Sequence, residues 1–423
     1  MKLISALKFR NYQIFIAGQA LSNIGNLMQQ VAVSWLAYQM TDSAFILGIV
    51  TFSKQMAAFF TGLFAGVVAD RFNKKKVVQL AQLMIGLASL LLTLVTWWEL
   101  TTIVFLIGVQ LFMGLMKGME MPCRQALVND ILPDKKYLVN AIALNSTVFN
   151  TARVVGPGVA GLLIPVAGEL MCFFIYGVLS FIIVFTLFFV KTFTNQKKNS
   201  HLDFKAEFLE GANYAFGFPT IKLSILFVGA FTLVGVSFIV LLPLLTDVVF
   251  NAGSEVFGYM NSALGLGAIV GGVFLANRSK ADGIQRFIFM AAAIFSVSLV
   301  VVSFSQLLVL TLIAIAFTGL GRVVIFAGTN TLLQTVSEED KRGRVLSLYI
   351  AMFMASVTIG GLLVGALADW IGVIPTLFLE GCLCLVISLV YLSQMKSIVV
   401  PQREAPDAMD VAKKGTDHFS KAS

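Results

Sequence analysis

The stretch Gly66-Val-Val-Ala-Asp70-Arg71-Phe72-Asn73-Lys74-Lys75-Lys76 lies between two long apolar runs, and it decides the fold. Because this many charges are not tolerated in the hydrocarbon core of a membrane, the stretch predicts a short loop at a membrane surface. A weaker copy, Gly272-Val-Phe-Leu-Ala-Asn277-Arg278-Ser-Lys280, places Asn277 at an offset of 207 from Asp70. The copy indicates that the whole architecture is duplicated.

Composition supports a membrane protein. Of 423 residues, 58% are hydrophobic and 12% are charged, and the mean hydropathy is +0.89. Soluble domains carry about 25% charged residues, so this class is excluded. A helix of about 20 apolar residues crosses a bilayer. Twelve stretches qualify, with boundaries good to about four residues: 12–40, 44–69, 77–98, 101–123, 138–165, 170–190, 221–246, 255–276, 287–305, 307–334, 345–369 and 374–393.

The predicted fold is therefore an all-α membrane protein with twelve transmembrane helices in two pseudo-symmetric halves of six. The N-terminal half covers residues 1–190, a polar cytoplasmic linker covers 191–220, the C-terminal half covers 221–393, and a disordered tail covers 394–423. Within the linker, helical spacing of Phe204, Phe208, Leu209 and Ala212 favours a surface tether over a regulatory site. The long first span has no cleavage site and reads as retained.

Basic residues predict the orientation. Five of the 30 lysines and arginines fall inside spans, and the other 25 fall on one side together with both termini. By the positive-inside rule, that side is cytoplasmic. The net charge of +8 is thus an orientation signal, and we expect no nucleic-acid partner. The cysteines, Cys123, Cys172, Cys382 and Cys384, lack metal-ligand spacing with a histidine and are expected to be packing residues, with no metal or cofactor.

The two halves align by hand. Gly114-Leu-Met-Lys117 matches Gly319-Leu-Gly-Arg322, and Asp134-Lys-Lys136 matches Asp340-Lys-Arg342. Parallel repeats of this kind place a substrate site between the halves, near the membrane midplane. The chain is expected to be a monomer that transports a small molecule.

The loop resembles the signature of the major facilitator superfamily, Gly-x-x-x-Asp-Arg-x-Gly-Arg-Arg/Lys. The residues that match it are Gly66, Asp70, Arg71, Lys74 and Lys75. Asn73 replaces a glycine of the signature, and asparagine is the residue other than glycine that best tolerates a left-handed backbone. The resemblance implies that this loop and its copy, with Asn277 and Arg278, brace the halves and govern switching between outward-facing and inward-facing states.

A second stretch, Arg153-Val-Val-Gly156-Pro157-Gly158-Val-Ala-Gly161, resembles the Gly-Pro motif of antiporters in that superfamily. Small residues beside a proline bend allow close helix packing. A packing seam alone is the alternative interpretation of these residues. With the family resemblance, export becomes the favoured direction.

Three further stretches resemble the branch that contains enterobactin-type siderophore exporters and macrolide efflux proteins. They are Pro122-Cys-Arg124-Gln125, Asn140-Ala-Ile-Ala-Leu-Asn145-Ser146 and Arg342-Gly343-Arg344-Val345. The resemblance covers residues 1 to about 395. One departure is Gln110, which stands where the drug-antiporter motif has an arginine in the fourth helix.

Ionisable residues inside the spans are the candidate site, because each costs at least about 2.5–3.5 kcal/mol on insertion scales. Lys117 and Arg322 occupy matching repeat positions and are expected to face one another across a basic cavity, with Lys54 nearby. Such a cavity favours an anionic substrate. The alternative is that each cation pairs with an acid or snorkels, which is favoured for Arg124. Asn26, Gln29 and Gln30 would hydrogen-bond the substrate or bridge helices.

Proton coupling needs an embedded titratable group. Glu120 is the first candidate, because it shares a helix face with Lys117 and Arg124, and Glu380 is the second. His201 and His418 lie in the linker and tail.

No phosphate-binding loop is present, so transport would be secondary. The spans contain no histidine or nucleophile elbow, so we expect no enzyme. The twofold repeat disfavours a channel. The sequence therefore predicts proton-coupled efflux of a small amphipathic, anionic, siderophore-like molecule across a bacterial inner membrane. Multidrug or macrolide efflux and lysophospholipid flipping are the alternatives.

Overall fold

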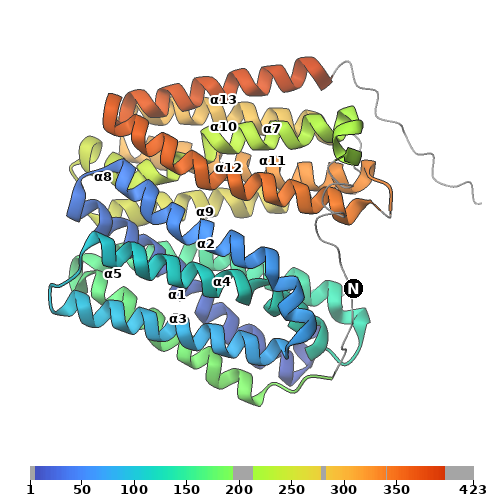
Figure 1. The fold of residues 1–423 in the computed structure, drawn as a ribbon. Helices are drawn as coiled ribbons and strands as arrows, with labels where there is room; N and C mark the ends of the chain where they lie inside the picture. Colours follow the sequence, from blue (N-terminus) through green and yellow to red (C-terminus); the bar gives the residue numbers. More distant parts are fainter. Residues whose placement is uncertain (1–4, 194–212, 278–282, 340, 396–423) are drawn as a thin grey trace, which may run out of the picture.

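The computed structural model describes residues 5–193, 213–277, 283–339 and 341–395, without the side chains of residues 63–71, 135 and 395. Within these ranges the chain is helical and has no strand. Figure 1 shows two stacked groups of helices, one built from the N-terminal half of the chain and one from the C-terminal half. The predicted all-α fold is confirmed.

The N-terminal half contains five long helices: α1 (Arg10–Thr41), α2 (Ala44–Arg71), α3 (Lys74–Trp97), α4 (Ile103–Ile131) and α5 (Leu138–Phe189). The short 3-10 turns Ser5–Lys8 and Lys135–Tyr137 precede α1 and α5. Helix α5 has 52 residues, but Gly168 interrupts it with φ 71° and ψ 172°, a conformation that glycine adopts readily. Gly168 therefore divides α5 into two membrane-crossing segments.

The C-terminal half begins with α7 (Pro219–Gly235), the 3-10 segment η3 (Val236–Leu241) and α8 (Leu242–Phe250), which follow one another directly. It continues with α9 (Ser254–Ala276), α10 (Ile284–Phe304), α11 (Leu308–Val336), α12 (Arg342–Ile371) and α13 (Val373–Met395). Between α5 and α7, residues 194–212 lie outside the described part, as does the predicted tether helix. The predicted tail lies almost entirely outside it as well.

Among the described residues, ten helical segments are long and apolar enough to cross a membrane. Helix α1 is not among them, although its 32 residues are long enough, because Gln19, Asn23, Asn26 and Gln29 lower its hydropathy. Helix α5 is counted once despite its break at Gly168. With α1 added and α5 divided, the arrangement agrees with the predicted twelve spans.

Glycines bring equivalent helices together in the two halves. A Cβ on Gly114 of α4 would clash with the Lys54 carbonyl of α2, and one on Gly319 of α11 would clash with the Leu264 carbonyl of α9. These two glycines are the ones that the sequence aligns as repeat partners. Close backbone approach through small residues is the usual way in which membrane helices pack, because lipid offers no hydrophobic driving force. The duplication is thus visible in the packing.

The largest contacts across the boundary between the halves lie where α5 meets α9 and where α2 meets α12. Gly161 of α5 lies against Gly258 of α9, and Gly48 of α2 lies against Gly361 of α12. In Figure 1 the two groups of helices diverge toward the end of the molecule that carries the N-terminus. We call the opposite end, which carries the loops around Asp42, Glu99 and Gly253, the outer end, because the charge pattern predicts it to be extracellular.

Candidate functional site

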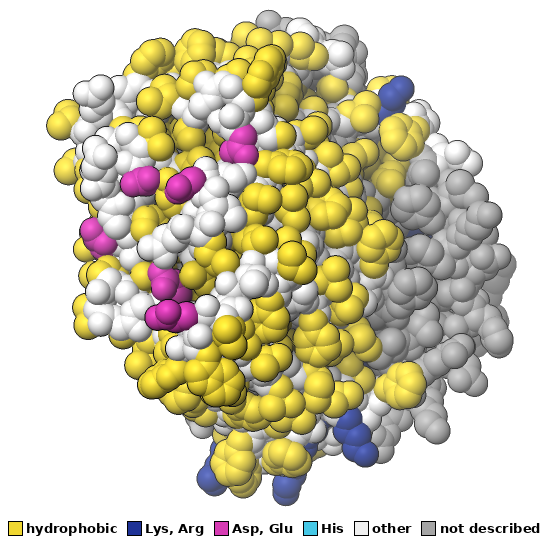
Figure 2. All heavy atoms as spheres, turned by 60° about the vertical axis from the view of Figure 1, so that its left-hand side comes forward, with side chains coloured by type: hydrophobic (Ala, Val, Ile, Leu, Met, Phe, Trp, Pro, Cys, Tyr) yellow, Lys and Arg dark blue, Asp and Glu magenta, His cyan; other side chains and the backbone are white. Residues whose placement is uncertain are grey.

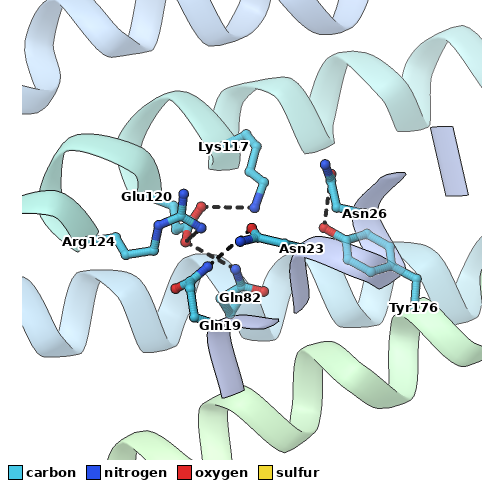
Figure 3. Close-up of polar contacts among 8 residues, drawn as sticks. All are labelled: Gln19, Asn23, Asn26, Gln82, Lys117, Glu120, Arg124 and Tyr176. Atoms are coloured by element: carbon cyan, nitrogen blue, oxygen red, sulfur yellow. Dashed lines mark hydrogen bonds and ion pairs between the residues drawn. The ribbon is translucent and has the colours of Figure 1, made fainter. Parts of the chain in front are cut away.

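The centre of the N-terminal half contains a fully buried carboxylate. Glu120 of α4 is 0% exposed. Its Oε2 lies 3.0 Å from Lys117 Nζ, and its Oε1 lies 3.3 Å from Arg124 Nη1. Gln82 of α3 donates from Nε2 to Oε1 at 3.2 Å. Figure 3 shows these side chains converging on Glu120.

Helical geometry explains this cluster. Lys117 and Arg124 stand three residues before and four residues after Glu120, so all three side chains lie on one face of α4. Two cations and a hydrogen-bond donor compensate the charge of the carboxylate, and the cluster keeps a net charge of +1. The spacing of the three charged residues in the sequence predicted that they share one face of the helix. The contact of Gln82 with Glu120 could not be predicted from the sequence, because it depends on how α3 packs against α4.

The polar side chains of α1 divide between two environments. Asn26 is partly exposed, and its Oδ1 accepts a hydrogen bond from Tyr176 of α5 at 3.4 Å. Gln30 is exposed. Gln29 is fully buried and donates to Ser89 of α3 at 3.4 Å, so it links helices inside the N-terminal half.

Three further cations belong to different helices: Lys54 of α2, Arg153 of α5 and Arg322 of α11. All three are partly buried. Lys54 interacts electrostatically with Lys117, and Arg322 interacts with Arg153. Among the described residues, no carboxylate lies within ion-pair distance of these three cations. Arg153 instead lies over the Phe149 ring, 4.6 Å from its centroid.

Arg322 and Arg153 lie near one another across the boundary of the halves, because α5 belongs to one half and α11 to the other. The structure therefore describes two neighbouring pairs of cations, Lys54 with Lys117 and Arg153 with Arg322. The direct facing of Lys117 and Arg322 across the cavity stays a prediction.

Glu380 of α13 has a different environment. It is 2% exposed, and neither of its carboxyl oxygens has a hydrogen-bond partner within the described part of the chain. Cys384, one turn along the helix, is its neighbour. Burial of a carboxyl group without hydrogen bonds or an opposite charge is costly in free energy, because nothing replaces its hydration.

The motif loop anchors those ends of the N-terminal helices that the charge pattern predicts to be cytoplasmic. Lys74 Nζ lies 2.8 Å from Asp130 Oδ2 of α4, and Lys75 Nζ donates to the Val190 carbonyl at the end of α5 at 2.8 Å. Asn73, which replaces the glycine of the signature, caps α3 by accepting from the Lys76 amide at 3.2 Å.

The rest of the predicted switch is only partly described. Gly66, Asp70 and Arg71 belong to α2, but the described side chains do not include theirs. Asn277 terminates α9, and Arg278 lies outside the described residues. The bracing of the two halves by this loop and its copy stays a prediction.

The predicted antiporter motif lies on the boundary between the halves. A Cβ on Gly156 would lie 2.9 Å from the Ile24 carbonyl of α1, and a Cβ on Gly161 would lie 2.8 Å from Gly258 Cα of α9. Pro157 lies within the helix and cannot donate to the Arg153 carbonyl. In α9, Gly265 leaves room for that carbonyl, and Ser262 donates to the Val154 carbonyl at 2.9 Å. The motif thus packs α5 against α1 of its own half and against α9 of the other half.

The two halves are joined at the outer end by contacts that the sequence did not reveal. Asp369 of α12 accepts from the Ala44 amide at 2.7 Å and from the Ser43 hydroxyl at 2.5 Å. Tyr38 of α1 donates to Asp247 of α8 at 2.5 Å. We call these residues the outer clamp. Figure 2 shows acidic side chains gathered on this end of the molecule.

An aromatic contact adds to the outer clamp. The rings of Trp35 on α1 and Phe257 on α9 stack with centroids 6.1 Å apart. The structure therefore has its halves closed together at the outer end. The only feature of the sequence that pointed to contacts at this end was the group of acidic residues in the predicted outer loops.

Solved structures confirm the fold. The inward-facing, unoccupied structure of a bacterial homologue of the human lysosomal transporter Spinster has a TM-score of 0.75 at 12% identity, covering 94% of this chain and 99% of that one. The nucleoside transporter NupG has a TM-score of 0.74 at 12% identity, covering 92% of this chain and all of that one. At such identity these likenesses bear on the fold alone.

Curated relatives include siderophore and drug transporters. The staphyloferrin A transporter of Staphylococcus aureus is 25% identical over 89% of this chain and 94% of its own length. Macrolide efflux protein A of Streptococcus pyogenes is 24% identical over 90% of this chain and 95% of its own length. The enterobactin exporter of Shigella boydii is 25% identical over 80% of each.

The family model described as transmembrane secretion effector matches residues 4–417, nearly the whole chain. The relatives and the fold are those of transporters, which are not enzymes. The many apolar helices make the chain a multi-pass membrane protein. This chain belongs to the transmembrane secretion effector family of the major facilitator superfamily.

Proposed function

We propose that this protein exports a small amphipathic anion, such as a carboxylate siderophore, out of the cell in exchange for protons. It would act as a monomer in the cytoplasmic membrane of a bacterium, with both termini in the cytoplasm. The relatives named as siderophore transporters support this class of substrate. The antiporter-like motif on α5 supports export.

One observation carries the proposal: Lys54, Arg153 and Arg322 have no carboxylate partner among the described residues, although all three are partly buried. A cation withdrawn from water is costly unless an opposite charge and hydrogen bonds compensate it. An anionic ligand between the halves would supply that compensation. A lipophilic cation there would add to the repulsion.

The two cation pairs suit a ligand with more than one carboxylate. Arg153 and Arg322 would hold one carboxylate across the boundary, since guanidinium groups bind carboxylates through two parallel hydrogen bonds. Lys54 would hold a second carboxylate on the N-terminal side, while Lys117 keeps its ion pair with Glu120. Asn26 and Gln30 would hydrogen-bond neutral groups of the ligand, and buried Gln29 would keep α1 in place beside α3.

Transport into inverted membrane vesicles tests the substrate class. Native protein should accumulate a polycarboxylate siderophore in preference to a lipophilic cationic dye. Arg322→Gln should lower siderophore uptake about tenfold or more, because a hydrogen bond between charged groups contributes about 1.5–3 kcal/mol. The matched control is Arg286→Gln, which removes an exposed arginine in α10. Equal losses in both variants, or preferred dye uptake, would overturn the proposed substrate class.

Glu120 is the proposed site of proton coupling, with Glu380 as the second candidate. Protonation of Glu120 would break its ion pairs with Lys117 and Arg124 and so change the charge of the site. Exchange requires substrate and proton to exclude one another. If a substrate carboxylate instead replaced Glu120 as the partner of Lys117, the unpaired Glu120 carboxylate would take up a proton. Substrate and proton would then bind together and would not exclude one another.

The pH dependence of siderophore affinity in detergent separates these cases. Proton exchange at Glu120 predicts that affinity falls as the pH is lowered, and that Glu120→Gln abolishes this dependence. Affinity that rises as the pH is lowered would disprove exchange at this residue. Export would then draw on the membrane potential, which contributes about 2.3 kcal/mol per charge at 100 mV.

Efflux of macrolides or other drugs is the second candidate, favoured by the buried Glu120 carboxylate and the macrolide efflux relative. A cationic amphipath and a proton would compete directly for Glu120. Dye uptake driven by a proton gradient and lost in Glu120→Gln would support this function over siderophore export.

A further inference from the structure

A groove on the outside of the N-terminal half is separate from the site between the halves. It lies between α3 and α4, has a volume of about 390 Å³, and its walls are apolar. Its wall residues include Val77, Leu80 and Met84 from α3, and Phe112, Met116 and Met119 from α4. The volume is within the range of small-ligand sites, about 300–1,000 Å³.

The groove faces the lipid. Leu80 in its wall is 58% exposed, and Leu87 and Leu91, further along α3 on the same face, are 48% and 50% exposed. In a protein of this class, an apolar side chain with such exposure contacts acyl chains. From Val77 to Met84 the groove extends about 10 Å along α3, at 1.5 Å per residue. A ligand there would be a chain that enters sideways from the bilayer.

At the end of the groove that is predicted to face the cytoplasm lies an exposed lysine, Lys76. Phe72, at this end, is part of the groove wall. Three consecutive lysines follow it: Lys74 pairs with Asp130, and Lys75 donates to backbone carbonyls. Lys76 is exposed, and within the described part of the chain no carboxylate lies within ion-pair distance of its ammonium. Lys76 stands four residues before Leu80, so it lies one helical turn beyond the groove on the same face.

We propose that this groove binds one acyl chain of an anionic phospholipid from the cytoplasmic leaflet, with the headgroup phosphate on Lys76. Two features select the charge. The Lys76 ammonium attracts an anionic headgroup, and it lies in the first turn of α3, where the helix dipole also favours negative charge. A zwitterionic headgroup would bring its own ammonium against the same cation. The apolar walls hold the chain without requiring any polar group of the lipid.

Mass spectrometry of the intact, full-length protein released from detergent micelles tests the proposal. The protein is incubated with equal amounts of phosphatidylglycerol and phosphatidylethanolamine, and the two adducts are compared. Phosphatidylglycerol should predominate for the native protein. Lys76→Ala should reduce that preference about fivefold, the effect expected of one basic residue near anionic lipid. Arg286→Ala removes an exposed cation from the first turn of α10 and should leave the preference unchanged.

A second variant tests the groove separately from the headgroup. Met116→Trp places a larger side chain in the wall and should reduce adducts of both lipids severalfold without altering their ratio. Thermal melting of each variant shows that it is folded. An unchanged preference in Lys76→Ala, an equal change in Arg286→Ala, or undiminished adducts in Met116→Trp would each overturn the proposal.

Discussion

At the scale of single residues, Glu120 and Glu380 are two buried carboxyl groups with opposite surroundings. Glu120 is in contact with Lys117, Arg124 and Gln82, whereas both oxygens of Glu380 lack partners within the described residues. Burial alone does not decide the consequence of removing a charged group. What matters is which partners the removal leaves behind.

Removal of the Glu120 charge should therefore destabilise the protein. Glu120→Gln leaves Lys117 and Arg124 without their carboxylate, and breaking a buried ion pair in this way costs about 3–5 kcal/mol. A fall in the melting temperature in detergent checks this, with Glu99→Gln in an outer loop as the control. A melting temperature equal to that of the control would mean that the cluster contributes no net stability.

Removal of the Glu380 carboxyl should have the opposite effect. Glu380→Met replaces an unpartnered polar group by an apolar one of similar length, and relieves a desolvation cost of about 1–3 kcal/mol. The melting temperature should rise. If siderophore transport in vesicles is lost in the same variant, Glu380 would replace Glu120 as the proposed proton site. A lower melting temperature would contradict the prediction and indicate that Glu380 has a partner.

At the scale of helices, glycine positions fix how closely the membrane spans approach. Gly114 and Gly319 serve the same purpose in the two halves, and Gly161 does so across the boundary between α5 and α9. A methyl group at such a position has to separate two backbones, since the neighbouring atoms are not flexible side chains.

The variant Gly161→Ala should therefore weaken the contact between the halves. Its Cβ would lie 2.8 Å from Gly258 Cα and 3.1 Å from two carbonyls of α9. The expected result is a shift away from the state closed at the outer end, measured as longer distances between spin labels on residues 99 and 307. Gly108→Ala is the control, because its Cβ meets nothing within 4 Å. Identical distances in both variants would disprove the effect.

At the scale of the whole molecule, the outer clamp connects the two halves at one end. Asp369 of the C-terminal half accepts hydrogen bonds from Ser43 and from the start of α2 in the N-terminal half, and Tyr38 reaches Asp247 in the same direction. The proposed export requires these contacts to break, because the halves would have to separate at the outer end for release.

Asp369→Asn should favour that separation. An asparagine keeps the shape of the side chain but has one acceptor oxygen, whereas both oxygens of Asp369 accept in the structure. Labels on residues 99 and 307 should show a larger population at long distance. Asp42→Asn neutralises another acid at the outer end and is the control. Equal populations in the two variants would indicate that net charge, and not the hydrogen bonds, governs closure.

The sequence by itself determined the features that repeat along the chain or that depend on local helical spacing. Hydropathy fixed the all-helical membrane class, and the matched segments around Gly114 and Gly319 fixed the duplication, because bilayer thickness and backbone hydrogen bonding leave few alternatives. The spacing of Lys117, Glu120 and Arg124 on one helix was enough to place them on a common face.

Only the tertiary structure decided which side chains from different helices meet. The contact of Gln82 with Glu120, the neighbouring of Arg153 and Arg322, and the capping of α2 by Asp369 join residues that are far apart in the chain. Periodicity gives the face of a helix but not the rotation and depth at which it packs. Those depend on close contacts such as Gly161 against Gly258, which arise only when both halves are assembled.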